Sequence, residues 1–244
     1  MIYVLVAISI VITQIPFLNK YLSLINTIVH EWGHASFALL TGGKVYKIKL
    51  NTDTSGFALT GTRGWIGRFF TVISGYPFSA LFPCFMIYLI LNNEYAACYW
   101  ILAMMLAVTI ILWLRDLFSL IWAGSVLLIL SLLIKYDMDV KWLIFVVMSI
   151  SLVNSIKSSC VVFTLSFKDY RNAGDASSLS QMTLIPSLVW GGLFLVSTIA
   201  IVGYSILIYA GMADDYYLKF IELIRAIKSD AVHLISWMAI NYSS

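Results

Sequence analysis

The chain has 244 residues, of which 61% are hydrophobic and 11% charged, and its formal net charge is +3. Soluble domains contain about 45–50% apolar and about 25% charged residues, so this composition excludes an ordinary soluble enzyme and indicates a membrane protein. The basic residues are scattered along the chain, which excludes a nucleic-acid-binding surface, and we expect a lipid bilayer rather than nucleic acid as the partner.

Seven hydrophobic segments follow one another along the chain, and most approach or exceed the roughly 20 residues that a helix needs to cross a bilayer. The first, residues 1–18, lacks the basic start and the small-residue cleavage site of a signal peptide, so we interpret it as a retained span. The others are residues 21–41, 66–91, 95–114, 117–134, 141–167 and 184–210. The expected fold is an all-α polytopic membrane protein with about six to seven transmembrane helices.

The connection between the second and third segments has a different pattern. "KVYKIKL" alternates in part, "NTDTSG" supplies turn residues, and "FALT" resumes the β pattern. We predict a small membrane-associated β-hairpin over residues 44–60. Its basic residues and those just after it place it on the cytoplasmic side by the positive-inside rule, namely Lys44, Lys47, Lys49, Arg63 and Arg68.

The end of the chain mixes apolar residues at helical spacing with charged ones such as Lys219, Glu222 and Arg225. This pattern predicts a C-terminal amphipathic helix at the membrane surface, and it also fits a helix that binds a partner protein. We therefore divide the chain into a helical membrane domain, residues 1–210, and a C-terminal amphipathic segment, residues 211–244.

The sequence His-Glu-Trp-Gly-His, residues 30–34, lies inside the second hydrophobic segment. On an α-helix two residues four apart lie on the same side, separated by about 6 Å of rise, so His30 and His34 can bind one cation. Glu31 can reach a water on that cation and act as a general base. Three ionisable groups in so short a stretch of a span are costly unless compensated, which favours a divalent metal over a structural polar cluster.

A catalytic zinc ion usually has three protein ligands and one open position. We predict Asp175 as the third ligand, because it precedes the last hydrophobic segment on the cytoplasmic side among small residues that allow close approach. Asp175 also fits a helix N-cap or a loop carboxylate. Asp116 is the second candidate, although beside Arg115 it also fits an ion pair. The remaining candidates fall on the predicted outer side, namely His233, Glu94 and Glu222.

Other polar and sulfur-containing residues of the spans have simpler interpretations. In the sixth segment we interpret Asn154 as an interhelical hydrogen-bonding residue and Lys157 as a snorkelling lysine, rather than as substrate contacts. The three cysteines, Cys84, Cys98 and Cys160, lie in apolar surroundings. We interpret them as buried small side chains and not as disulfides or metal ligands.

These features together resemble the site-2-protease family of intramembrane zinc metalloproteases, in particular its compact M50B-like branch of bacteria and plants. The resemblance covers most of residues 1–210, and a bacterial inner or plasma membrane is therefore the expected location. The resemblance rests on the following features: the His-Glu-Trp-Gly-His motif in a span, Gly42-Gly43 and the basic hairpin, "SGYPFSALF", Gly174-Asp175-Ala176, Ile185-Pro186 and Trp190.

The resemblance implies that His30, His34 and Asp175 bind Zn²⁺ while Glu31 activates water. The implied reaction is hydrolysis of peptide bonds in or near transmembrane segments of membrane protein substrates. A strand of the hairpin could hold an extended substrate by strand addition. The alternative is a non-proteolytic pseudoprotease or a metal-binding scaffold subunit of a membrane complex; the intact Glu31 favours the enzyme, because a scaffold needs no general base.

Overall fold

The computed structural model describes residue 11 and residues 14–136 and 141–209. The predicted first span lies largely outside these residues, and the predicted C-terminal amphipathic segment lies wholly outside them. Up to Val202 the chain forms one compact unit, and the last turns of the final helix belong to a second unit.

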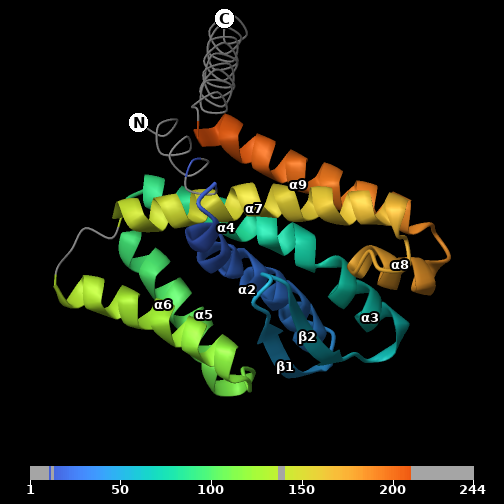
Figure 1. Ribbon diagram of the computed structural model, residues 1–244, viewed down its shortest axis with the longest axis horizontal. Helices are drawn as coiled ribbons and strands as arrows, with labels where there is room; N and C mark the ends of the chain where they lie inside the picture. Colours follow the sequence, from blue (N-terminus) through green and yellow to red (C-terminus); the bar gives the residue numbers. More distant parts are fainter. Residues whose placement is uncertain (1–10, 12–13, 137–140, 210–244) are drawn as a thin grey trace, which may run out of the picture. The chain divides into compact units, whose positions relative to one another are not determined.

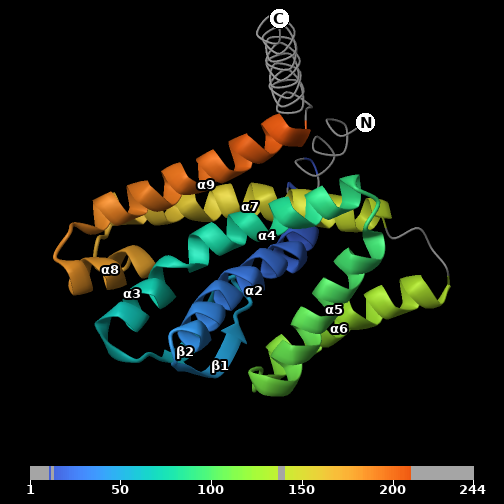
Figure 2. The ribbon, with the colours of Figure 1, turned by 180° about the vertical axis from the view of Figure 1, so that it is seen from behind.

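The described part of the chain is helical except for one hairpin, as predicted (Figures 1 and 2). Its elements in chain order are α2 (Pro16–Leu40), β1 (Lys44–Leu50), β2 (Gly56–Gly61), α3 (Gly64–Ile73), α4 (Gly75–Leu91), α5 (Tyr95–Leu112), α6 (Leu117–Lys135), α7 (Lys141–Lys168), α8 (Asp175–Thr183) and α9 (Ser187–Tyr209).

Among the described residues, four helices are long and apolar enough to cross a membrane, namely α5, α6, α7 and α9. Helices α3 and α4 meet at 49° and add a fifth if they form one broken span. The predicted number of six to seven spans is therefore not confirmed. Helix α2 is not among the candidates, because Lys20 and the polar residues around the motif lower its hydropathy. The apolar helices indicate a multi-pass integral membrane protein.

Helix α2 is the element around which this unit is arranged, because it packs against α3, α4, α7 and both strands. Pro16 lies in its first turn, where a missing N–H group costs nothing. The helix ends where Gly42 adopts a positive φ of 76° and the amides of Gly42 and Gly43 bind the carbonyls of Leu39 and Ala38. The His-Glu-Trp-Gly-His motif is thus held in the C-terminal half of α2, surrounded by other elements.

Strands β1 and β2 form the predicted antiparallel hairpin, to within one residue of its expected end. Along β1, Ile48 and Leu50 are fully buried while the intervening lysine is partly exposed, which explains the partial alternation in the sequence. The loop of the hairpin is tied to α2, because the Thr27 hydroxyl donates to the Thr54 carbonyl over 2.7 Å.

The outer edge of β1 is covered by the connection between α5 and α6. The Ile48 amide donates to the Trp113 carbonyl at 3.0 Å, and the Leu50 amide donates to the Ser119 hydroxyl at 2.9 Å. Within the described part of the chain the sheet has two strands in the order β1-β2, so β2 forms its free edge.

Two local features differ from the sequence prediction. The segment predicted as one span over residues 66–91 is two helices that bend at Ser74. Helix α8 was not predicted, because "DASSLSQMT" is short and mostly polar and carries no long apolar periodicity. It is held by buried Ala176 and Leu179, which belong to one apolar cluster with Trp190 and Phe194.

The polar and sulfur-containing residues of the spans mostly follow expectation. Asn154 on α7 donates to the Ser23 hydroxyl on α2 over 3.0 Å, as predicted for an interhelical hydrogen bond. Lys157 is exposed. Cys84 and Cys98 are buried, but Cys160 is exposed on α7. The prediction of a buried side chain is wrong for Cys160, because that face of α7 points away from the helix bundle.

Candidate metal centre

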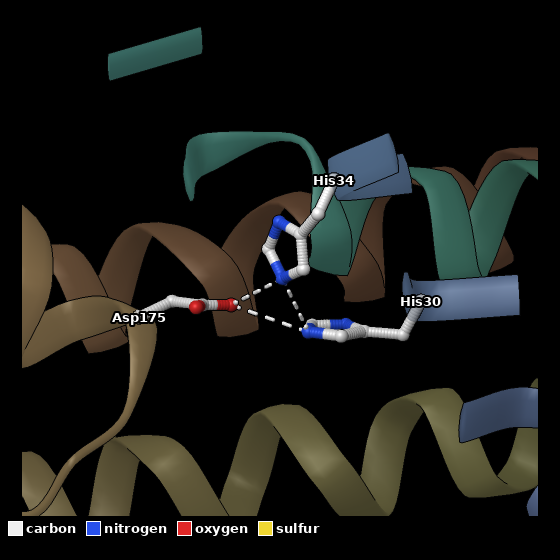
Figure 3. Close-up of side chains that lie close together, drawn as sticks. All are labelled: His30, His34 and Asp175. Atoms are coloured by element: carbon white, nitrogen blue, oxygen red, sulfur yellow. Dashed lines mark hydrogen bonds and ion pairs between the residues drawn. The ribbon is translucent and has the colours of Figure 1, made fainter. Parts of the chain in front are cut away.

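Two residues of α2 and one residue of α8 converge at a single point (Figure 3). The Oδ2 atom of Asp175 lies 3.2 Å from Nε2 of His30 and 3.3 Å from Nε2 of His34, and the two Nε2 atoms are 3.1 Å apart. Ligand atoms bound tetrahedrally to zinc at about 2.0–2.1 Å would be separated by roughly 3.3 Å. The spacing and the donor set of two imidazoles and one carboxylate both fit a zinc ion.

The backbone of α3 fixes the orientation of the His34 ring. Nδ1 of His34 lies 2.7 Å from the carbonyl oxygen of Thr71. A carbonyl only accepts hydrogen bonds, so Nδ1 carries a proton and Nε2 is the nitrogen that faces the site, where the neutral ring offers a lone pair to a metal. A hydrogen bond of this kind on the second ring nitrogen is typical of histidines that bind metals.

The bend between α3 and α4 leaves room for the two imidazoles only because residue 75 is glycine. A Cβ atom at Gly75 would lie 2.5 Å from Cε1 of His30 and 2.6 Å from Cε1 of His34. Tyr76, the next residue, packs the edge of its ring against His30 with 4.7 Å between ring centroids. Sequence reasoning used "SGYPFSALF" only for the resemblance and did not assign these two residues to the site. No local pattern in the sequence marks these two residues, because their role depends on the bend between α3 and α4.

Glu31 is buried, with 4% of its surface exposed, and lies in the wall of the same cavity as the three converging side chains. The cavity has a volume of about 510 Å³, which is in the range of a binding site for a small molecule or a peptide segment. On the hairpin side, a Cβ atom at Gly56 would lie 3.1 Å from Oε1 of Glu31, and the carboxylate also interacts with the backbone amide of Ala58. Glu31 therefore lies directly against β2 at the wall of the cavity.

Asp175 lies in the first turn of α8, where the helix dipole favours a negative charge. Burial alone would raise the pKa of its carboxyl group, but the neighbouring His34 and His30 outweigh this effect and hold the pKa below its ordinary value. The carboxyl group is therefore ionised, which is the form that a metal ligand requires.

The other predicted ligands do not join this cluster. Asp116 caps α6, because its carboxylate accepts from the Ser119 amide at 3.1 Å and from the Ser119 hydroxyl at 2.8 Å. Arg115 instead donates to backbone carbonyls at the end of α5, so the interpretation of these two residues as an ion pair is wrong. Among the described residues, His30, His34 and Asp175 are the group with metal-ligand spacing, and Glu94 is not part of it. Glu222 and His233 lie outside the described residues.

A zinc-dependent peptidase typically has a histidine pair on one helix, a glutamate beside the first histidine and one further side chain from a distant segment. In agreement, the chain matches the model of the Peptidase M50B-like family over residues 1–205 and therefore belongs to that family. This match confirms the resemblance to site-2 proteases and supports a membrane metallopeptidase. No curated protein and no solved structure matches the chain.

Proposed function

We propose that this chain is a zinc-dependent intramembrane metalloprotease that hydrolyses peptide bonds in or near transmembrane segments of membrane protein substrates. The observation that carries the proposal is the convergence of the two motif histidines with Asp175 inside a cavity that Glu31 also lines. The apolar helices of the chain and its membership of a peptidase family support the same reaction.

Each residue of the site has a separate role in this proposal. His30, His34 and Asp175 would hold Zn²⁺, which when bound polarises a carbonyl group and lowers the pKa of a bound water. Glu31 accepts the proton of the attacking water and later donates a proton to the leaving amine. Thr71 keeps His34 in the ligating tautomer through its carbonyl oxygen, and Gly75 leaves the space in which both imidazoles fit.

The free edge of β2 is where we propose that an extended substrate pairs. Because the Ile48 amide points to Trp113, Ile48 and its partner Ala58 form a non-hydrogen-bonded pair of the ladder. The backbone N–H and C=O of Ala58 therefore point away from β1, and Ala58 and Phe57 line the cavity. An added strand could donate to the Ala58 carbonyl there, and it would share the Ala58 amide with the Glu31 carboxylate.

A proline at residue 58 tests this pairing. Ala58→Pro removes an outward amide that also interacts with Glu31. The ladder to β1 stays intact, because proline is tolerated at such edge positions. We expect a higher KM for a membrane-embedded substrate with normal zinc content, whereas the control Ala58→Val keeps the amide and should match the wild type. A loss confined to kcat would show that residue 58 acts through Glu31, and strand pairing would be rejected.

The proposed activity itself is tested with Glu31→Gln in the purified protein, reconstituted in liposomes with a membrane-embedded reporter substrate. We expect zinc content to persist and hydrolysis to fall by about 10²–10⁴-fold, the usual contribution of a general base. The control is Glu94→Gln, which alters an exposed glutamate remote from the cluster. Unchanged hydrolysis in Glu31→Gln would contradict the proposed role of Glu31. A wild-type protein that binds zinc and cleaves no substrate would favour the non-proteolytic scaffold.

A further inference from the structure

A second cavity, of about 320 Å³, lies between α2 and the helices α5, α6 and α7. Every residue that lines it is hydrophobic. The two lining residues with polar atoms direct them elsewhere: the Tyr21 hydroxyl binds the Ser125 hydroxyl at 2.7 Å, and Nε1 of Trp122 donates to the Tyr21 carbonyl at 3.0 Å. The cavity therefore offers no hydrogen-bonding partner to a ligand or to water.

This cavity is separate from the candidate metal centre, because the two lie on opposite faces of α2. Ile25 and Ile28 face the apolar cavity, whereas His30, Glu31 and His34 face the cavity with the converging ligands. Occupation of the apolar cavity is therefore independent of the proposed peptidase function.

Interhelical contacts lie at both ends of the apolar cavity. At one end Nε1 of Trp32 on α2 donates to the Thr109 hydroxyl on α5 over 2.7 Å. At the other end the rings of Tyr21 on α2 and Trp122 on α6 pack with 6.1 Å between their centroids. Ile25 and Ile28 lie between these two contacts along α2. The cavity thus lies between two interhelical contacts, where apolar side chains line it.

The apolar lining of this cavity determines which kind of molecule can bind in it. An apolar cavity does not hold ordered water, and a void of this size deprives the lining side chains of dispersion contacts. Three of the four helices around it, α5, α6 and α7, are candidate membrane spans and are therefore in contact with lipid hydrocarbon. We propose that the acyl chain of a membrane lipid occupies the cavity between α2, α5, α6 and α7.

The lipid tail would fill the space between the α5–α6 pair and the rest of the unit. The first turn of α6 also holds β1, through the Ser119 hydroxyl and the Leu50 amide. The acyl chain therefore supports the helix pair on which the hairpin rests.

Photolabelling of the full chain in liposomes tests the proposal, with a phospholipid that carries a diazirine in the middle of one acyl chain. Met104 and Met105 are a matched pair on α5: Met104 is 64% exposed, whereas Met105 lines the cavity and is 6% exposed. Lipids around the protein label Met104 in any case. We expect label also on Met105 and on the fully buried Met148 of α7, and labelling of Met104 alone would overturn the proposal.

A substitution that fills the cavity gives a second, independent readout. Val147→Phe places a larger side chain in the lining and should abolish labelling of Met105, while Met104 stays labelled. The control is Ile111→Phe, at a residue that is 70% exposed on α5. This variant should leave the labelling of Met104 and of Met105 unchanged. Persistent labelling of Met105 in Val147→Phe would overturn the proposal. Labelling of Met105 only after removal of residues 1–13 would also overturn it, because the chain's own N-terminal segment would then be the occupant.

Discussion

The substitution Gly75→Ala is the most direct test of the candidate metal centre, because it adds one methyl group and changes no ligand. The new Cβ atom would lie 2.5 Å from Cε1 of His30, 2.6 Å from Cε1 of His34 and 2.7 Å from Nε2 of His30. Ordinary van der Waals contact begins near 3.4 Å, so the His30 ring must move by about 0.9 Å. Both imidazoles are displaced at once.

The expected loss follows from the tolerance of metal coordination. Ligand distances in a functional zinc site lie within about 0.2 Å of their usual values, so a shift of about 0.9 Å is several times larger than the site accepts. Changes of the groups that orient metal ligands typically lower metal affinity or activity about 10–100-fold. We expect Gly75→Ala to reach the upper end of this range, which corresponds to about 2.8 kcal/mol of binding free energy.

Zinc affinity is measured by competition with a chromophoric chelator, beside the thermal stability of the metal-free protein. The matched control is Gly124→Ala in α6, where a new Cβ atom would meet no atom within 4 Å. Gly124→Ala should bind zinc as the wild type does. Gly75→Ala with unchanged zinc affinity would refute the argument, because the histidines would then not occupy the positions from which the metal centre is inferred.

Two further predictions concern the two candidate aspartate ligands and one interhelical hydrogen bond. Asp175→Asn should lose zinc. Asp116→Asn should retain zinc and nearly all of its stability, because asparagine caps a helix about as well as aspartate. The opposite zinc contents, measured by mass spectrometry of the metal, would make Asp116 the ligand. Asn154→Leu should lower stability by about 0.6 kcal/mol, as for a typical interhelical hydrogen bond, without changing zinc content. Ser23→Ala should lower stability by a similar amount. If the loss of stability in the double variant equals the sum of the two single losses, the two side chains do not interact.

The sequence by itself determined the class of protein, most positions of the described helices, and the motif residues His30, Glu31 and His34 of the candidate site. The apolar composition indicated membrane helices, and the ends of the predicted segments agree with α5, α6 and α7 to within a few residues. The spacing of His30 and His34 within one helix was sufficient to place both imidazoles on the same side, because helical geometry is local. The hairpin was predictable for the same reason, since its turn residues and alternation are local signals.

The tertiary structure alone decided which features far apart in the sequence meet. Asp175 reaches His30 and His34 because α8, which has no apolar periodicity to reveal it, is held by buried Ala176 and Leu179. The role of Gly75 also depends on a bend and a close approach of two helices, which no local pattern records. The edge of β1 is covered by the α5–α6 connection, so only the fold identifies β2 as the free edge of the described sheet. Such contacts are set by the packing of whole elements, whereas the sequence pattern reports the preference of each element alone.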